Sequence, residues 1–361
     1  MDKTFSLGLE LGPTRLNLAQ MELVAGKSRL RAMASMEHSF SMDEIYQDPK
    51  KLKALLKQAY AIQPFKGKTV VSCLPAAQIK IISLSFRPVE GQANEVPILA
   101  ALRERLKGEL DNLVVDFMIL RQDETDPSKR DALVALAPRD KVMAHLELLG
   151  AAGLEVEALD IGPAALARLV CHAGAIHTPE FPLAPNVLLV NFGADSSFLT
   201  VIWGRRLMLD RVVEFSENRM FARLKQVLDM PQALAMRLLY AKDSALDDAD
   251  EGATQTRQMV AEVLRPEFEL LLQEINKTLV YMASRTRGKS VDHLYLAGRV
   301  ACYPGIFESL RQQLKVPVRR LDPVAVFKAE NSGVYDDELG ALAGMAVTTG
   351  LALRGVPEHG A

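Results

Sequence analysis

Hydrophobic and polar positions alternate along the first part of the chain, which is the pattern of half-buried β-strands. In LGLELGPTRLNLAQMEL, residues 7–23, Gly12 and Pro13 interrupt an apolar run, and alternation then resumes. A strand, a tight glycine turn and a returning strand are therefore expected. The strands expected here cover residues 4–11, 15–23, 29–39, 68–73 and 78–84, and a helix is expected over 49–61.

The middle of the chain combines helical and strand periods. The segment VPILAALRERLKG has apolar residues at helical spacing and stops near Gly108, and the polar stretch QDETDPSKRD is a turn between two strands. Helices are expected over 95–107, 141–149 and 163–170, and strands over 114–121, 132–137 and 154–159. This mixture indicates an α/β chain.

A proline-rich joint, HTPEFPLAPN, precedes a second strand–turn–strand unit. Setting LGLELGPTRLNLAQME beside LLVNFGADSSFLTVIW places Glu10 on Asn191 and Gly12 on Gly193, and both halves continue into a third strand. Chance similarity between short hairpins is the alternative to a true repeat. Glycine has no Cβ, so that backbone amides at such turns can approach an anion closely. Two such turns facing each other would form a phosphate clamp.

The last part of the chain adds three elements. A long amphipathic helix is expected over 256–285. After it, VDHLYLAGRVACYPGIFESLRQQL predicts a strand ending at Gly298, a loop, and a helix beginning near Pro304. The closing stretch YDDELGALAGMAVTTGLAL, residues 335–353, predicts a helix of small residues that suits tight packing.

Composition limits the possible partners. The chain has 361 residues, of which 49% are hydrophobic, so that it can bury two sizeable cores. Its 43 basic and 45 acidic residues nearly cancel, which gives no global field toward nucleic acid or a membrane. Three widely spaced cysteines fit neither a disulfide framework nor a zinc site and favour a reducing compartment. Neither a leader segment nor a membrane span is expected, and cytoplasmic location is the default.

Segments spread over nearly the whole chain carry a family resemblance. They are TVVSCLPAAQIKIISLSF, NLVVDFMILRQ, ALVALAPRDKVMAHLELLGAAGLEVEALDIGPAALARL, VLLVNFGADSSFLTVIWGRRL, EINKTLVYMASRTRGKSVDHLYLAGRVACYPGIFESLRQQLKVPVRRLDP and GALAGMAVTTGLALR. Together with the two glycine hairpins, they resemble the superfamily of actin, hexokinase and heat-shock chaperones. Within it, the chain is most similar to the PilM family of type IV pilus assembly proteins, which is related to FtsA.

The resemblance implies an α/β, actin-like (ribonuclease H-like) fold of two lobes with a small inserted α+β subdomain. The first lobe would comprise residues 1–83, 154–185 and 335–355, the second lobe residues 186–334, and the FtsA-type insert residues 84–153. That insert separates the chain from sugar kinases and chaperones. A small-molecule kinase is disfavoured because the insert has no convincing acidic constellation.

The resemblance also implies a function. PilM-like proteins bind ATP between the lobes and hold the short cytoplasmic tail of PilN, a bitopic inner-membrane protein. The chain would then be a cytoplasmic scaffold, peripheral to the inner membrane through its partners. Other inner-membrane components of pilus or type II secretion machinery are further candidate partners. Nucleic acid is not expected as a partner, and no amphipathic helix for direct membrane insertion follows Arg354.

Family motifs assign candidate ligand residues one by one. The residues matching places where relatives contact phosphate or adenosine are Gly12, Thr14, Arg15, Gly193, Ala194, Ser196, Glu274, Lys277, Gly298 and Arg299, and Glu10 and Asn191 match the magnesium-linked positions. Glu274 and Lys277 are also spaced as an ordinary helical ion pair.

Four of these places depart from the family pattern. Glu10 and Asn191 each replace an aspartate, Arg299 replaces the second glycine of a Gly-Gly pair, and Ser216-Glu217-Asn218 replaces another glycine pair. Pro13 also removes an amide from the first turn, and Asn191 cannot serve as a base. These departures favour a fold whose nucleotide cleft is degenerate. An ATP-binding switch or a slow ATPase is the alternative.

Other candidates have structural interpretations. Asp160 precedes Gly162-Pro163 at the lobe junction, where capping of the following helix is favoured over catalysis. His172 and His177 are not spaced for a helical zinc site. The basic clusters at 103–107, 205–206 and 284–289 are expected to be solvated faces, with lipid headgroups as the alternative for one of them. The acidic stretch 243–253 is expected to be a surface loop.

Overall fold

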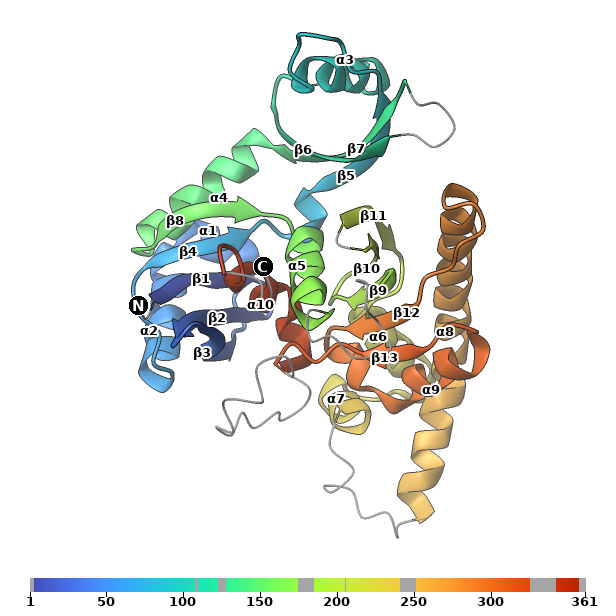
Figure 1. Cartoon of the computed structure of the whole chain (residues 1–361). Helices are drawn as coiled ribbons and strands as arrows, with labels where there is room; N and C mark the ends of the chain where they lie inside the picture. Colours follow the sequence, from blue (N-terminus) through green and yellow to red (C-terminus); the bar gives the residue numbers. More distant parts are fainter. Residues whose placement is uncertain are drawn as a thin grey trace. The chain divides into compact units, whose positions relative to one another are not determined.

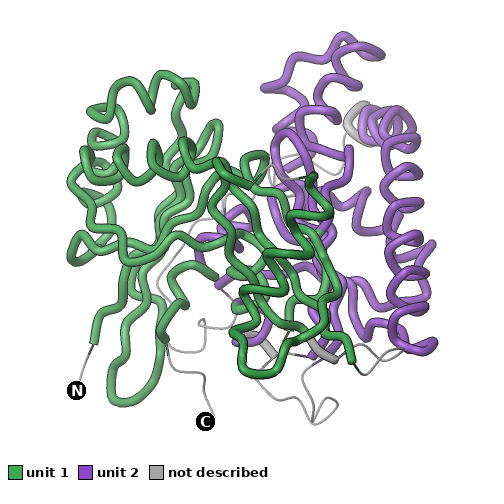
Figure 2. Tube along the Cα trace, turned by 90° about the horizontal axis from the view of Figure 1, so that it is seen from above, with its two compact units in different colours: residues 1–168, 206–210, 350–357 green, residues 169–205, 211–349, 358–361 purple. Residues whose placement is uncertain are grey.

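The computed structural model describes residues 3–107, 110–122, 128–174, 185–204, 206–240, 251–324 and 342–356. The chain forms two compact units (Figure 1). Unit 1 comprises residues 1–168, 206–210 and 350–357, and unit 2 comprises residues 169–205, 211–349 and 358–361 (Figure 2).

Unit 1 contains a five-stranded sheet in the order β3-β2-β1-β4-β8. Its strands are β1 (Lys3–Leu11), β2 (Arg15–Val24), β3 (Lys27–Glu37), β4 (Thr69–Cys73) and β8 (Glu155–Asp160). The first three form an antiparallel meander, β4 runs parallel to β1, and β8 runs parallel to β4. The helices α1 (Met42–Gln47), α2 (Pro49–Ile62) and α4 (Arg139–Ala151) contribute apolar residues to the core of this sheet.

A second, three-stranded antiparallel sheet in unit 1 has the order β5-β7-β6. It consists of β5 (Lys80–Phe86), β6 (Leu113–Gln122) and β7 (Arg130–Pro138), and α3 (Glu95–Arg105) packs against it. A short 3₁₀ turn, η1 (Ala76–Gln78), precedes β5. The sheet has its own core, which includes Leu84, Ile98, Leu102 and Val134. The domain boundaries expected from the sequence, including the insert at 84–153, stay predictions.

Unit 2 repeats the arrangement of the first sheet in the order β11-β10-β9-β12-β13. Its strands are β9 (Val187–Phe192), β10 (Ser197–Trp203), β11 (Arg206–Val213), β12 (His293–Ala297) and β13 (Val318–Arg320), and the first five residues of β11 group with unit 1. The helices are α6 (Glu217–Leu228), α7 (Gln232–Tyr240), α8 (Glu251–Arg285) and α9 (Pro304–Gln313), with a 3₁₀ turn, η3 (Arg299–Cys302). α5 (Gly162–Gly174) and α10 (Ala346–Ala352), preceded by η6 (Leu342–Met345), contribute residues to both units.

The internal repeat is confirmed at the level of hydrogen-bonded register. Glu10 pairs with Asn17 in the first hairpin, and Asn191 pairs with Phe198 in the second, so each partner lies seven residues along the chain. The turns after Gly12 and Gly193 are therefore equivalent. In both sheets a parallel strand then pairs with the first strand, β4 in unit 1 and β12 in unit 2.

Several elements differ from the sequence expectations. Helices α1, α6 and α7 were not predicted; α1 and α7 are short, with six and nine residues, whereas α6 has a regular apolar stripe that includes Met220, Phe221 and Leu224 and was overlooked. α8 continues through Pro266 and begins at Glu251, so that it takes in the end of the stretch expected to be a loop. The described part of the closing segment is a 3₁₀ turn followed by the seven-residue helix α10. Residues 335–341, His177 and most of the acidic stretch lie outside the described residues.

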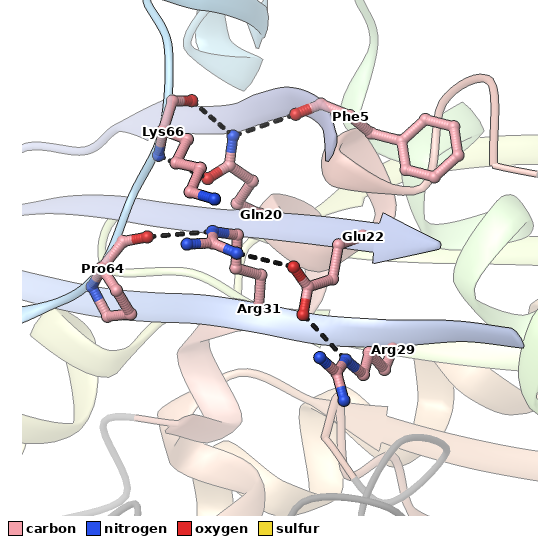
Figure 3. Close-up of polar contacts among 7 residues, drawn as sticks. All are labelled: Phe5, Gln20, Glu22, Arg29, Arg31, Pro64 and Lys66. Carbon is pink, nitrogen blue, oxygen red and sulfur yellow. Dashed lines mark hydrogen bonds and ion pairs between the residues drawn. The ribbon is translucent and has the colours of Figure 1, made fainter. Parts of the chain in front are cut away.

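A buried polar network ties the chain before β4 to the sheet of unit 1 (Figure 3). Gln20, on β2, donates from Nε2 to the carbonyl oxygens of Phe5 and Lys66 at 3.0 and 2.7 Å, and its Oε1 accepts from the Lys66 amide at 2.8 Å. Arg31 donates to the Pro64 carbonyl oxygen at 3.0 Å and to the Glu22 carboxylate. Burial acts to raise the pKa of Glu22, but hydrogen bonds from Arg31 and Arg29 outweigh it, and the pKa is lowered. Residues 64–66 are thereby held against β2 and β3.

A second buried network runs through His145 of α4, which is fully buried. Ser72 donates from Oγ to the Leu9 carbonyl oxygen at 3.0 Å, so it must accept from His145 Nε2 at 3.1 Å. His145 Nδ1 then accepts from the Tyr46 hydroxyl at 3.0 Å. This chain joins α1, α4, β4 and β1, and it requires the neutral imidazole. Burial lowers the pKa of His145 to about 4.

The network predicts a specific loss of stability in acid. The pKa of His145 is lower in the folded state than the ordinary value of 6.5. The unfolded residue therefore takes up a proton as the pH falls from about 6.5 toward 4, and the free energy of unfolding decreases by about 3 kcal/mol in this window. Above about pH 6.5 the contribution of His145 is fully present.

Urea unfolding followed by circular dichroism, at about pH 7.5 and about pH 4.5, measures this effect. The variant His145→Gln keeps an amide that can reach Ser72 but does not titrate. Between the two pH values, the free energy of unfolding of this variant should therefore fall by about 3 kcal/mol less than that of the wild type. Equal pH dependence in the two proteins would contradict the assignment.

Candidate functional site

The first glycine turn is closed by contacts within unit 1. The Gly12 amide donates to the Arg15 carbonyl oxygen at 2.9 Å, and Pro13 has no amide hydrogen. His38, at the end of β3, contacts the Gly12 carbonyl oxygen through Nε2 at 3.2 Å and donates its amide to the Thr14 carbonyl oxygen at 2.8 Å. The first two residues of the turn therefore have no amide left for an external anion.

The charged groups around this turn are linked through two polar side chains. Arg15 donates from Nε to Ser35 Oγ at 2.7 Å, and Ser35 donates to Asn17 Oδ1 at 2.7 Å. Asn17 Nδ2 lies 3.5 Å from the carboxylate of Glu10. Arg15, a candidate phosphate ligand, and Glu10, a candidate metal ligand, are thus connected through side-chain contacts that span β1, β2 and β3.

The second glycine turn contacts the N-terminus of α6. The carbonyl oxygens of Gly193 and Ala194 accept the amides of Glu217 and Asn218 at 3.1 and 2.9 Å. Ser216 accepts the next two amides of the helix, one through its side chain and one through its carbonyl oxygen, at 3.1 and 3.2 Å. The first three amides of α6, which have no partner within the helix, are therefore satisfied by the turn and by the cap residue Ser216. None of these three donors is left for a phosphate.

Glycine is required at both corners of unit 2 for reasons of packing. A Cβ at Gly193 would lie 2.4 Å from the Ser196 carbonyl oxygen, and one at Gly298 would lie 2.2 Å from the Phe192 carbonyl oxygen. Gly298 also has φ +88°, and its amide donates to the Ala343 carbonyl oxygen at 3.0 Å. Close contact between neighbouring strand ends accounts for these glycines without a ligand.

Arg299 and Glu217 form a bidentate ion pair in unit 2. Arg299 donates from Nε and Nη2 to the two carboxylate oxygens at 2.8 and 2.6 Å, and the side chains are only 17% and 8% exposed. The guanidinium also lies over the ring of Tyr240, 5.4 Å from its centroid. Burial and the adjacent Glu217 carboxylate raise the pKa of Tyr240 well above its ordinary value. The two residues that replace family glycines thus bind each other.

Glu274 and Lys277 lie on α8 beside a different group of residues. Lys277 Nζ is 2.6 Å from Glu274 Oε1, and Arg211 contacts the other carboxylate oxygen. The hydrogen bond from Lys277 lowers the pKa of Glu274. These residues line a pocket of about 370 Å³ between α8 and the end of β11, and its lining includes neither Gly298 nor Arg299. The structure therefore brings Arg299 together with Glu217, and Glu274 together with Arg211.

The remaining candidates have mainly structural contacts. Asp160 accepts from Arg168 at 2.7 Å, from Arg354 at 3.0 Å, and from the Ile161 amide at 2.8 Å. It therefore anchors two arginines and does not reach the first amides of α5. Asn191 is half-buried on β9. Within the described ranges, no three His, Cys, Asp or Glu side chains gather as a metal site.

Sequence reasoning missed that Glu217 and Arg299 are partners. Both positions were flagged as departures from glycine, and their opposite charges were a usable signal. Their separation of 82 residues, however, gave no indication that η3 and α6 would meet here.

Comparisons with known proteins agree with this architecture. The family model described as type IV pilus assembly protein PilM matches residues 8–356. Among solved structures, a chain from a PilM–PilN type IV pilus biogenesis complex is 21% identical, with a TM-score of 0.73 and 98% of each chain covered. This likeness confirms the two-lobed, actin-like α/β fold expected from the sequence.

Two further structures are similar at lower scores. The ethanolamine utilization protein EutJ from Carboxydothermus hydrogenoformans is 14% identical, with a TM-score of 0.49 and 97% and 89% of the two chains covered. MreB5 of Spiroplasma citri bound to ADP is 11% identical, with a TM-score of 0.43 and 90% and 94% covered. Across the described part of the chain, none of the helices has the length and apolar composition needed to cross a bilayer.

The buried ion pair predicts a strong energetic coupling. Arg299→Met should lower the free energy of unfolding by roughly 3–5 kcal/mol, because it leaves Glu217 as a buried, unpaired charge. Adding Glu217→Gln should recover part of this loss. Urea unfolding of the four proteins in the double-mutant cycle measures the coupling, and a coupling energy below about 0.5 kcal/mol would contradict it.

A matched control is available on α8. Arg265 pairs with Glu262, and these side chains are 58% and 66% exposed. Arg265→Met should change the free energy of unfolding by less than about 1 kcal/mol, because the pair is solvated.

Proposed function

Because the chain belongs to the family of type IV pilus assembly protein PilM, we propose that it is an actin-like scaffold that binds the cytoplasmic tail of a PilN-like inner-membrane protein. It works on the cytoplasmic side, and its partner connects it to the membrane. Its nucleotide cleft is degenerate. The scaffold function therefore rests on protein contacts rather than on ATP turnover.

One observation carries the partner assignment. The solved structure that is similar over 98% of both chains is described as a PilM–PilN complex. A similar backbone offers similar sheet edges and helix faces, which are what an extended tail uses for main-chain pairing and for side-chain pockets.

Unit 1 has a surface suited to such a tail. β6 is the terminal strand of its three-stranded sheet, so that one edge can accept main-chain hydrogen bonds. Val114 and Met118 are 36% and 43% exposed on β6, and Met143 is 46% exposed on α4, which contacts β6. An extended segment between the insert and the first sheet would pair with β6 and place apolar side chains on these three residues.

The contacts of the candidate ligand residues support the degenerate cleft. In unit 1, the Gly12 amide is bonded inside the turn. In unit 2, the first three amides of α6 are bonded to the protein, and the Arg299–Glu217 pair occupies positions where the family pattern described above has glycines. A nucleotide would have to break these bonds before it could form its own. These residues do not fit ATP or magnesium.

Tail binding can be tested with purified components. A fluorescent peptide of the cytoplasmic tail of the PilN-like protein from the same genome should bind the chain with micromolar affinity in a polarisation titration. Met118→Glu should weaken binding tenfold or more, because it puts a charge on the apolar side-chain surface. Val280→Glu is the matched control, since Val280 is 71% exposed on α8 in unit 2, and it should leave affinity unchanged. Absence of binding by the wild-type chain would exclude the proposal.

Nucleotide binding is tested separately. Calorimetric titration of the chain with magnesium-ATP to about 1 mM should give no saturable heat, whereas an ATP-binding actin-like protein under the same conditions should. To test whether the ion pair blocks the nucleotide, the variant to use is Glu217→Gly with Arg299→Gly, which removes both side chains. Gly298 is unsuitable because any side chain there would meet the Phe192 carbonyl oxygen. A saturable wild-type isotherm would favour the ATP-gated switch instead.

A further inference from the structure

The segment from α2 to the start of β4 carries a one-sided distribution of charge. Residues 49–68 contain six lysines and no acidic residue, in a chain whose basic and acidic residues nearly balance. These lysines are Lys50, Lys51, Lys53, Lys57, Lys66 and Lys68. All but Lys51 are exposed.

Lys51 differs from the others because the fold already engages it. Its ammonium is 3.0 Å from a Glu44 carboxylate oxygen and lies over the ring of Phe40. The other five lysines form what we call the lysine face: Lys50, Lys53 and Lys57 on α2, and Lys66 and Lys68 in the loop that follows.

The spacing on α2 places its three lysines together. Residues 50, 53 and 57 are separated by three and four positions, which brings their side chains to one face of a helix. The opposite face carries Leu52, Leu55 and Leu56, which are buried in the core. The backbone of Lys66 is fixed by Gln20, and that of Pro64 by Arg31, so the loop lysines are held in place beside β2 and β3 (Figure 3).

Helix stability does not account for this arrangement. The N-terminus of a helix carries partial positive charge, which disfavours lysine there and favours it in the last turn. α2 has Lys50 and Lys51 in its first turn, no acid in that turn beyond its cap Asp48, and no basic residue in its last turn. α3 and α6 follow the usual order, with a glutamate in the first turn and basic residues in the last. Lys50 and Lys51 are thus placed against the helix dipole, while Lys53 and Lys57 lie in the middle of α2.

We propose that the lysine face binds the anionic headgroups of a lipid bilayer. Lysine ammonium groups are flexible point charges that suit a diffuse negative surface, whereas recognition of one phosphate or carboxylate usually employs the planar fork of arginine. The face acts by electrostatic contact and does not insert a helix.

This inference does not depend on the proposed tail complex. Lipid binding is measured without any peptide, and tail binding is measured without lipid. Failure of one leaves the other standing.

Co-sedimentation with vesicles tests the lysine face. The full chain should bind vesicles of phosphatidylcholine with about 30% phosphatidylglycerol at about 50 mM salt, should be released by about 500 mM salt, and should not bind pure phosphatidylcholine. The triple variant K50Q/K53Q/K57Q should bind at least a hundredfold more weakly, because each lysine near an anionic surface contributes about fivefold. Its melting temperature should stay close to that of the wild type, because the three side chains are exposed and Lys50 opposes the helix dipole.

The matched control is K225Q/K289Q/K315Q, which removes three exposed lysines of unit 2 and changes the net charge equally. It should bind vesicles like the wild type. Three results would overturn the proposal: no binding to anionic vesicles, equal loss in both triple variants, or retention on poly-glutamate or duplex DNA at the same salt that matches or exceeds vesicle binding. The last result would indicate an acidic protein or a nucleic acid as the partner.

Discussion

Each unit is organised around the corner where its first two strands turn, and the polar backbone groups near that corner bond to the protein itself. In unit 1, the Gly12 amide closes the turn and His38 contacts its carbonyl oxygen. In unit 2, the turn carbonyls accept the first amides of α6, and the end of β12 packs against Phe192 at Gly298. Because buried amides must be paired, these contacts fix how the following strands and helices leave the corner. At Gly193 and Gly298 this packing requires glycine whether or not a ligand is bound.

The Arg299–Glu217 pair extends the same principle to side chains. A charge that replaces a glycine in a crowded region is costly unless an opposite charge meets it with full hydrogen bonding. Here both replacements are charged, and the fork of Arg299 satisfies both oxygens of Glu217 while stacking on Tyr240. Neither substitution is readily tolerated without the other. A single change at either position is therefore expected to be costly, because it leaves the other charge buried and unpaired.

Sequence patterns predicted the two repeated hairpins, but they did not predict the side-chain contacts between residues far apart in the chain. The two hairpins were predictable because alternation and glycine position recur with the same spacing, and the register confirms this at Glu10 and Asn191. The continuation of α8 through Pro266 was predictable from its apolar period, although its start was not. The pairing of Glu274 with Lys277 followed from their helical spacing. The contacts of Arg299 with Glu217 and of Glu274 with Arg211 were not predictable, because each joins elements whose approach depends on the whole sheet. The candidate ligand positions stay predictions from the family pattern, while the side-chain pairing among them came from the structure.

The two units carry different parts of the proposed activity. The β6 edge and the lysine face belong to unit 1, whereas the Arg299–Glu217 pair and the closed end of α6 belong to unit 2. A change that blocks a ligand position in unit 2 leaves the sheet edge and the α2 surface of unit 1 intact, since none of the side chains concerned is shared. Loss of nucleotide contacts is therefore compatible with retained partner binding. The charges separate in the same way: those of the Arg299–Glu217 pair neutralise each other inside unit 2, whereas Lys50, Lys53 and Lys57 of α2 are exposed to solvent. The exposed lysines of α2 are therefore accessible to a binding partner, whereas Arg299 and Glu217 are already paired within the protein.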